Sequence, residues 1–549
     1  MGKNKSNFVV QGTILAAAGI LVRIIGVIYR IPLRQTLGST AMGYYSTAYD
    51  VYSLFLLLSS MSMPLAVSKI VSARVAKRQM KNAYRAFIGA MIFSVIIGLV
   101  FSLSMYFGAG VIADFSKYSE AKLSLQILAP TLFIMSILGV MRGYFQGLGT
   151  MIPTAISQVL EQIANCILSI VCGIYLMKVG DELGQGEAYA SAGVTIGTLA
   201  GATTALIFFI FVFFMYRGML RRQMKRDLTE KLESYGGLTK VLFFTIVPVL
   251  LSTTIYNFSN LFDSVIFGNI MSGYYKIPES EYTSTWGIYS SEYRLLTNVP
   301  VAVASALASA IIPSLVRSVN EGNKRQVLSK IDTAIRFVAI IAIPVGIGLS
   351  MMAGPVLYIL FPDPQTYNQS VHLMRLAIFT VLAFSISTIT NGILQGIDRM
   401  KTTVINASIA LGIHLVLIFV ILYVFNGGIV GVVISDISYG IIICLLNIWS
   451  LYRYTGYRQE LLKTFILPGI SACIMGIFAY TIHHFMNNAL ENAIGLSRSN
   501  LLSTGVAVFA AVIIYFALLL ALRAVGEDEL RMFPKGEILI RIARKIHLL

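Results

Sequence analysis

Three arginines interrupt an apolar stretch near the start of the chain. Arg23, Arg30 and Arg34 lie in the sequence GILVRIIGVIYRIPLRQ, which otherwise has the composition of a membrane helix. Arg23 and Arg30 are seven residues apart, so two helical turns place them on one face. A charge at the bilayer centre costs about 3 kcal/mol, so it normally faces a cavity or a partner. We predict that Arg23 and Arg30 face a cavity; Arg34 fits snorkelling to the outer interface equally well.

Arginines in such a cavity predict an anionic cargo. The guanidinium group pairs bidentately with phosphate oxygens, so the cavity would suit a diphosphate whose apolar tail stays in lipid. The sequence contains no GxxxxGK[ST] motif of an ATP-driven motor. Its loop carboxylates form no arrangement for glycosyl transfer. We therefore expect a transporter without a cofactor, with a membrane-embedded glycosyltransferase or a scaffold as alternatives from other classes.

The elements that must position these residues are membrane helices. The chain has 549 residues, of which 56% are hydrophobic and 12% are charged. A soluble domain cannot bury that much apolar surface, and the composition is typical of a polytopic membrane protein. The apolar runs predict an all-α fold of fourteen spans, at about 8–30, 44–67, 86–113, 124–146, 154–177, 190–216, 241–268, 286–316, 332–360, 371–396, 403–425, 429–452, 464–486 and 501–523. The four cysteines lie inside such runs without metal-ligand spacing, so we predict neither a disulfide nor a metal site.

The positive charge is distributed asymmetrically. The net charge is +17, and Lys and Arg gather after the second, sixth, eighth, tenth and twelfth spans and in the C-terminal tail. The alternate loops are poor in Lys and Arg, and two of them, FPDPQTYNQS and NGG, contain none. Because positive charge stays inside, both termini should be cytoplasmic, in a bacterial plasma membrane. This topology explains the basic surface better than nucleic-acid binding does, and we expect no nucleic-acid partner.

An internal repeat divides the chain into two halves. RGYFQGLGTMIPTAIS from Arg142 aligns with NGILQGIDRMKTTVIN from Asn391, and GYYSTAYDVY from Gly43 aligns with GIYSSEYRLL from Gly287. Matching loops lie on one side, so the halves are parallel repeats, and two such lobes enclose a central cavity. The predicted organisation is a six-helix lobe at 1–216, a basic cytoplasmic linker at 217–240, a second six-helix lobe at 241–452, two additional helices at 453–523 and a basic cytoplasmic tail at 524–549.

Further polar side chains fall within the predicted spans. Asp50 and Arg294 occupy equivalent repeat positions, and Asn257, Asn260 and Asp263 form a stripe in the seventh span. A structural ion pair is the alternative for Asp50 and Arg294, and an interfacial position is the alternative for Glu161. The predicted polar cavity residues are Asp50, Asn257, Asn260 and Glu292. The predicted groups that bind the substrate diphosphate are Arg23, Arg30 and Arg294.

The residues RIIGVIYRIPL, EYRLLTNVPVAVASALASAIIPSL and the GxxQG turns resemble the multidrug/oligosaccharidyl-lipid/polysaccharide flippase superfamily. With fourteen predicted spans, the chain looks most like MurJ-type lipid II flippases and stage V sporulation protein B-like polysaccharide biosynthesis proteins. The resemblance implies cavity arginines in the first, second and eighth helices. Arg23 and Arg294 match two of them. In the first helix Tyr29 takes the place of the second arginine and Arg30 follows. The arginine of the second helix is absent, and Asp50 or Val51 stands near its position.

The resemblance also implies a function. We expect a flippase that moves lipid II, a polyprenyl-diphosphate-linked cell-wall precursor, to the outer leaflet by alternating access, in peptidoglycan synthesis and cell-shape maintenance. A flippase for another polyprenyl-linked polysaccharide and a cation-coupled drug exporter are the alternatives. The last two helices would hold the lipid tail. Coupling to Na⁺ or H⁺ and to the membrane potential is expected, with Asp263, Asp436 and Glu161 as the candidate residues. We expect a monomer in contact with membrane lipids, its glycan substrate and cell-wall synthesis enzymes.

Overall fold

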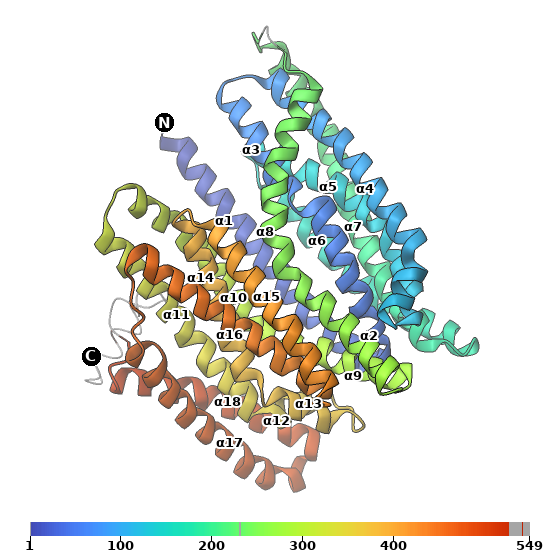
Figure 1. Cartoon of the computed structure of the whole chain (residues 1–549), viewed down its shortest axis with the longest axis vertical. Coiled ribbons are helices and arrows are strands. Elements are labelled where there is room, and N and C mark those ends of the chain that lie inside the picture. Colours follow the sequence, from blue (N-terminus) through green and yellow to red (C-terminus); the bar gives the residue numbers. More distant parts are fainter. Residues whose placement is uncertain (1, 230–231, 526–540, 542–549) are drawn as a thin grey trace. The chain divides into compact units, whose positions relative to one another are not determined.

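The protein is helical throughout the part that the structure describes. The computed structural model describes residues 2–229, 232–525 and 541. They form helices and connecting turns, with no strand among them (Figure 1). The predicted all-α, multi-pass membrane architecture is therefore confirmed. Twelve helices of the described residues are long and apolar enough to cross a membrane, and Ala17–Ile28 is a shorter apolar helix. The predicted number of fourteen spans is not confirmed.

The chain packs into two compact units, Met1–Ser291 and Glu292–Leu549. This boundary lies further along the chain than the predicted linker at 217–240. Helix α7 continues to Lys225 and helix α8 starts at Tyr235, so much of that linker is helical. The predicted lobes follow the sequence repeat, whereas the units follow packing, and the lobe boundaries stay predictions. Most of the predicted tail at 524–549 lies outside the described residues.

Unit 1 contains the first nine α-helices. Their bounds are α1 (Gly2–Ile28), α2 (Arg30–Leu56), α3 (Met63–Ala76), α4 (Met80–Ser116), α5 (Lys122–Gly147), α6 (Ile152–Glu182), α7 (Gly186–Lys225), α8 (Tyr235–Asn269) and α9 (Glu279–Ile288). Short π-helical segments follow α2 at Leu57–Met61 and α8 at Ile270–Tyr274. The four long helices α4 to α7 match the predicted spans and extend beyond them.

The start of the chain differs from the prediction. The first helix was expected to run to about residue 30, with a loop before a second span at 44. In the structure α1 ends at Ile28, and Arg30 begins α2. The backbone leaves the helical conformation at Gly38, where φ is 82° and ψ is 174°. Glycine adopts this conformation without a steric penalty, so Gly38 joins two helical segments in what looked like a loop.

The repeated glycines have the same packing role in both units. A Cβ atom at Gly143 would lie 2.8 Å from the carbonyl oxygen of Pro64, and one at Gly147 would lie 2.7 Å from Cβ of Val71. These glycines therefore let α5 approach α3 closely. Gly392 does the same in unit 2, because its Cβ atom would lie 2.8 Å from that of Ala308. Small residues four apart are typical of close helix contacts in membranes.

Unit 2 contains the remaining helices. Their bounds are α10 (Arg294–Asn320), α11 (Lys324–Met351), α12 (Ala353–Leu360), α13 (Tyr367–Met374), α14 (Ala377–Gly396), α15 (Met400–Tyr423), α16 (Gly428–Thr455), α17 (Leu467–Ile494) and α18 (Leu496–Ala521). Figure 1 shows α17 and α18 running alongside each other, and they pack against α11 and α12. They correspond to the two additional predicted helices.

A neutral polar network joins α14, α15 and α16 inside unit 2. Asn447 donates hydrogen bonds to Thr390 Oγ1 over 3.1 Å and to Asn391 Oδ1 over 2.8 Å. Its own oxygen accepts from Asn406 Nδ2 over 2.9 Å, and the same nitrogen lies 3.1 Å from Ser450 Oγ. All five residues are buried. Because buried amides are stable only when they are hydrogen-bonded, the network fixes the register of the three helices.

This network gives a stability prediction. Replacing Asn447 with Leu removes the centre of the network and leaves Asn391 and Asn406 buried without this partner. We expect the free energy of unfolding to fall by about 1–3 kcal/mol. Thermal unfolding in detergent micelles measures the loss. Asn488→Ala is the matched control, because Asn488 is exposed in α17, and an equal loss in both variants would contradict the prediction.

Candidate functional site

The candidate site in unit 1 is centred on Arg30. Its guanidinium carbon lies 6.0 Å from the ring centroid of Tyr45 and 5.8 Å from that of Tyr49. These tyrosines are four residues apart on α2, with their centroids 5.7 Å apart, and the phenol of Tyr29 also lies beside the guanidinium. Aromatic faces attract a cation through their quadrupoles, most strongly where water is excluded. The tyrosines therefore hold the guanidinium in a defined place.

The cage does not neutralise Arg30. No carboxylate of the described residues forms an ion pair with it, and its buried Nε donates no hydrogen bond to them. An arginine inside a membrane body normally pairs with an anion or faces water, because an unpaired charge there is costly. The geometry thus leaves a directional donor for an incoming anion. The predicted cavity role of Arg30 stays a prediction, and these contacts agree with it.

The other two N-terminal arginines differ from Arg30. The side chain of Arg23 is exposed in α1 and makes no hydrogen bond or ion pair within the described part of the chain. Arg34 is only 2% exposed and has interaction partners. The snorkelling interpretation of Arg34 is therefore wrong, because its guanidinium is enclosed by the protein. Because Arg34 is buried, its substitution is not a suitable control for substitutions of the other two arginines.

The predicted polar residues of unit 1 lie in different surroundings. Asp50 is buried in α2 and has partners, whereas Asn260 is half-buried in α8. The side chain of Asn257 lies outside the described residues. Glu161 forms an ion pair with Arg142 on the neighbouring helix α5, with 2.6 Å between Oε2 and Nη2. Glu161 is therefore paired with Arg142, which was not predicted as a site residue from the sequence.

In unit 2, Arg294 and Glu292 lie at a change of helix type. Residues Tyr289–Tyr293 form a π-helical segment, and Arg294 is the first residue of α10. Glu292 is 1% exposed, Arg294 is half-buried, and both have interaction partners. Single π-helical turns are frequent at functional sites because they change the direction in which side chains point. The diphosphate-binding role of Arg294 stays a prediction.

The two aspartates predicted for cation coupling are buried in separate units. Asp263 belongs to α8 in unit 1, and Asp436 belongs to α16 in unit 2. Near Asp436, the Nδ1 atom of His414 lies 3.0 Å from the carbonyl oxygen of Ser435, and the His414 ring packs on Tyr439. Cation coupling through Asp263, Asp436 or Glu161 stays a prediction.

An apolar cavity of about 390 Å³ lies between the last two helices and the rest of unit 2. It is lined by fifteen residues of α11, α12, α17 and α18 and of the turn at Met352, among them Pro344, Gly348, Met475, Val512 and Tyr515. Tyr515 donates its hydroxyl hydrogen to the carbonyl oxygen of Ile340, over 2.9 Å, so its polar end is satisfied. The lining is chemically matched to a hydrocarbon chain.

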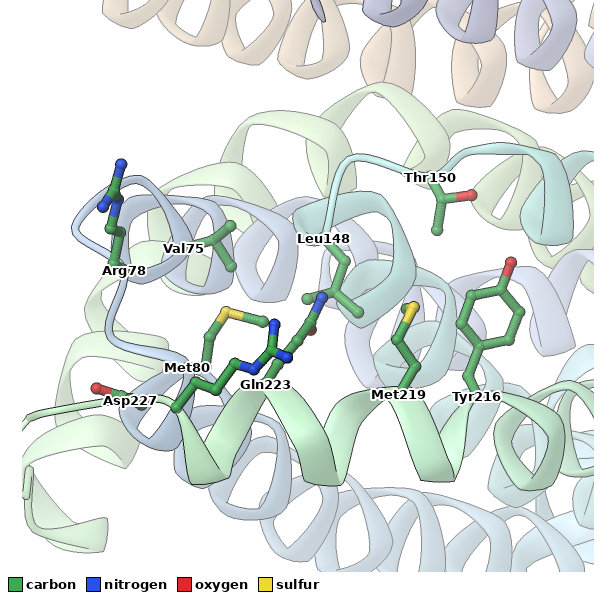
Figure 2. Close-up of a pocket in the computed structure, with 10 residues that line it drawn as sticks. Val75, Arg78, Met80, Leu148, Thr150, Tyr216, Met219, Gln223 and Asp227 are labelled. Carbon is green, nitrogen blue, oxygen red and sulfur yellow. The ribbon is translucent and has the colours of Figure 1, made fainter.

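A second cavity, of about 420 Å³, opens on unit 1 at the ends of α3, α5 and α7. Figure 2 shows Gln223, Met219 and Tyr216 projecting from α7 toward Leu148 and Thr150. Asp227 closes one end, where it accepts hydrogen bonds from the backbone amides of Lys81, over 2.6 Å, and Thr229, over 2.8 Å. The cavity thus lies beside a docked connection between α7 and α8.

The same connection is fastened further along. Both oxygens of Glu233 accept from the guanidinium of Arg74, and the Glu233 amide donates to Asn82 Oδ1 over 3.0 Å. Arg85 donates to the Glu233 carbonyl over 2.9 Å and lies over the ring of Tyr235. These contacts anchor the segment before α8 to α3 and α4. We assign this region a structural role.

Comparison with known proteins places the chain in a family. Residues 9–319 match the family described as polysaccharide biosynthesis protein, and residues 289–420 match the MatE family. The first match covers more than half of the chain. The chain belongs to the polysaccharide biosynthesis protein family. This confirms the resemblance that the repeats and arginines indicated.

Two curated relatives of this family member come from Bacillus subtilis (strain 168). Lipid II flippase MurJ is 26% identical over 490 residues, which cover 86% of this chain and 88% of the relative. Stage V sporulation protein B is 23% identical over 539 residues, which cover 98% of this chain and 100% of the relative. The chain therefore spans nearly the full length of both. Their different names leave the cargo open.

Two solved structures share the fold. The inward-closed conformation of lipid II flippase MurJ aligns with a TM-score of 0.61 at 15% identity, covering 92% of this chain and 98% of that one. The inward-facing conformation of a multidrug resistance MATE family transporter of the MOP superfamily aligns with a TM-score of 0.65 at 15% identity, covering 80% and 98%. The family member thus has the transporter fold of this superfamily.

Sequence reasoning missed two parts of the site. The tyrosine cage was not predicted, although Tyr45 and Tyr49 lie four residues apart in the repeated GYYSTAYDVY motif. Arg142 was also missed, although it opens the other repeated motif. In both cases the repeat marked the position, but the partner lies beyond the break at Gly38 in the first case and on another helix in the second.

The docked connection gives a pH prediction. Burial alone would raise the pKa of Asp227, but the hydrogen bonds from Lys81 and Thr229 outweigh it and lower that pKa below its ordinary 3.8. A lowered folded-state pKa stabilises the fold above the unfolded-state pKa, and this stability disappears as the pH falls through the folded-state pKa. We therefore expect Asp227→Asn to lower the melting temperature at about pH 7 and to have little effect below about pH 3.

Melting temperatures of both proteins across this range measure the effect. The control is Glu182→Gln, because Glu182 is exposed at the end of α6. A deficit of Asp227→Asn that is the same at every pH would show that the carboxylate charge contributes nothing.

Proposed function

We propose that the protein is a flippase for a polyprenyl-diphosphate-linked glycan, with lipid II as the first cargo to test. The observation that carries the proposal is Arg30, a cation held by tyrosines with a buried Nε that no described residue accepts from. A diphosphate supplies the missing acceptors and the missing charge. A cationic drug would meet repulsion at this site, which disfavours the drug exporters of the superfamily.

The choice of lipid II rests on similarity. MurJ of B. subtilis carries lipid II in its name, whereas stage V sporulation protein B carries no cargo in its name. Another polyprenyl-linked glycan is the second candidate, favoured by the family description. Both share the polyprenyl diphosphate, which is the part that Arg30 would recognise. We also propose that Arg23 and Arg294 contact the diphosphate.

The apolar cavity of unit 2 supports a lipid substrate. Its lining of aliphatic and aromatic side chains suits one end of a polyprenyl chain. A chain that remains partly in the bilayer needs a lateral groove rather than an enclosed pocket, and α17 and α18 supply an apolar surface beside the transporter fold. We propose that the tail lies against this cavity while the head group crosses.

Transport would proceed by alternating access. The head group enters from the inner leaflet, pairs with the arginines and leaves on the outer side when the two lobes rock. An inside-negative potential favours outward movement of an anion by about 2.3 kcal/mol per charge per 100 mV. Arginines that move with the cargo cancel part of this charge, so the potential also favours return of the empty carrier. Na⁺ or H⁺ coupling through Asp263, Asp436 or Glu161 is a further proposal.

The cellular setting follows from the same proposal. We place the chain in the bacterial plasma membrane with both termini in the cytoplasm, on the basis of the charge asymmetry. It would work as a monomer beside the enzymes that make and polymerise the cell-wall precursor, and so affect cell shape.

Complementation tests the cargo directly. In a host lacking other flippases, cells depleted of this protein should lose lipid II from their outer face and regain it on re-expression. Failure to restore exposure, with the protein correctly inserted, would exclude lipid II and leave another polyprenyl-linked glycan.

Substitution of Arg30 tests the proposed binding group. We expect Arg30→Ala to reduce transport at least about tenfold, because it removes the cation that balances the diphosphate. Arg30→Lys should recover only part of the activity, because an ammonium group cannot make the bidentate contact. The readout is outer-face lipid II per inserted molecule. Arg221→Ala, at an exposed arginine of α7, is the control, and full activity of Arg30→Ala would refute the assignment.

Filling the apolar cavity tests the tail site. Val512 lines the cavity, and Phe509 lies on the same helix but is 70% exposed and outside the lining. Val512→Trp should slow transport of the long-chain substrate roughly fivefold without weakening binding of short-chain farnesyl diphosphate, because only the long tail needs this volume. Phe509→Trp should leave both unchanged. Equal behaviour of the two tryptophan variants would place the tail elsewhere.

A further inference from the structure

Arg142 and Glu161 form an ion pair in the interior of unit 1. Arg142 is 7% exposed, and the side chain of Glu161 is 26% exposed. Besides the 2.6 Å contact with Glu161, the Nε of Arg142 lies 3.2 Å from Ser157 Oγ. Its Nη1 makes no hydrogen bond to the described residues. The guanidinium thus uses its Nε and Nη2 atoms for contacts with the protein.

Unit 2 shows that the equivalent helices can be joined without charged residues. The repeat alignment places Asn391 at the position of Arg142, Asn406 at that of Ser157 and Ala410 at that of Glu161. There the equivalent helices are joined by the neutral network around Asn447. A neutral amide network is cheaper to bury than an ion pair, because desolvating two charges offsets their attraction. The charges in unit 1 therefore exceed what helix packing requires.

The pair is coupled to the Arg30 cage through shared tyrosines. The carboxylate of Glu161 acts electrostatically on the hydroxyls of Tyr49 and Tyr52, and Tyr49 is also a wall of the Arg30 cage. Tyr49 and Tyr52 are themselves in ring contact, with centroids 5.6 Å apart. Helix α1 also contacts α6, since a Cβ atom at Gly26 would lie 3.6 Å from Nε2 of Gln162, an ordinary van der Waals distance. Glu161 therefore lies within electrostatic range of Tyr49, which also borders Arg30.

The geometry points to Glu161 as an internal counter-anion that the cargo displaces, and to Arg142 as a further phosphate-binding residue. In the empty carrier Glu161 neutralises Arg142. When an anionic head group enters beside Arg30, its phosphate oxygens replace the Glu161 carboxylate on the guanidinium, and no covalent bond changes. This inference rests on the proposed function, because it assumes a diphosphate cargo. It adds a residue pair that sets the affinity for that cargo and its release.

If the Glu161 carboxylate competes with the cargo for Arg142, removing this carboxylate should strengthen binding rather than weaken it. Glu161→Gln removes the competitor but keeps the size and a hydrogen-bond acceptor, so it should tighten binding about tenfold. Arg142→Gln should weaken binding about tenfold, because it removes the cation and leaves Glu161 to repel the anion. A merely structural ion pair would lower thermal stability in both variants without tightening binding in either.

The experiment uses the full-length protein in lipid nanodiscs and measures the Kd of farnesyl diphosphate by titration calorimetry, with melting temperatures in parallel. Glu182→Gln, on the same helix and exposed, is the carboxylate control and should leave Kd unchanged. The double variant Arg142→Asn with Glu161→Ala transplants the unit 2 residues and should fold. It should bind about tenfold more weakly than Glu161→Gln, because it lacks the phosphate-binding cation.

The outcomes separate this inference from the proposed function. If Arg30→Ala weakens binding but Glu161→Gln leaves Kd unchanged or raises it, the counter-anion role is refuted and the flippase proposal stands. Equal affinity of the double variant and Glu161→Gln would refute the role of Arg142. If the unchanged protein does not bind farnesyl diphosphate, both proposals fail.

Discussion

A cation inside a membrane protein must be neutralised or solvated, and the interior of unit 1 depends on how this is achieved. Arg142 is neutralised by Glu161, whereas Arg30 is surrounded by neutral tyrosines. Aromatic rings stabilise a cation by about 0.5–2 kcal/mol, less than the cost of leaving a charge unpaired in a membrane. The difference is the driving force for binding an anion. The site therefore lacks an internal anion for Arg30, and an anionic cargo would supply it.

The repeat explains how one fold carries this site at little cost to its stability. Gly143 and Gly392 perform the same close helix packing in the two units, so the scaffold is duplicated. The polar chemistry is not duplicated. Where unit 1 has Arg142 and Glu161, unit 2 has a network of amides centred on Asn447. Unit 2 instead contributes the apolar cavity beside α17 and α18. Each unit thus combines the same close helix packing with a different set of side chains.

The fold could be predicted where the signal is local. Apolar length and breaks at Gly and Pro determine a membrane helix, so α16 was expected at 429–452 and is found at Gly428–Thr455. The kink at Gly38 was not predicted, because the polar residues around it resemble a loop, whereas in the structure both flanks are helical and Gly38 leaves the helical conformation. Arg34 was judged by its distance from the membrane centre, whereas neighbouring side chains determine its burial.

The site could be predicted only in part, for the same reason. The residue type and spacing of Arg30 identified it as unusual without any knowledge of its neighbours. Of the tyrosines around Arg30, Tyr45 and Tyr49 lie beyond the break at Gly38, and the partner of Arg142 lies on another helix. A single sequence does not reveal which helical segments are adjacent. The sequence also does not show which charged residues pair with each other. Glu161 was assigned a role in cation coupling or at the interface, and only the structure shows its ion pair with Arg142.

The most direct test of the central claim is an experimental structure of the protein with a bound polyprenyl diphosphate. The account predicts phosphate oxygens within hydrogen-bond distance, about 2.7–3.2 Å, of the Arg30 guanidinium, including its Nε. A diphosphate bound elsewhere, with Arg30 still enclosed only by Tyr29, Tyr45 and Tyr49, would contradict it.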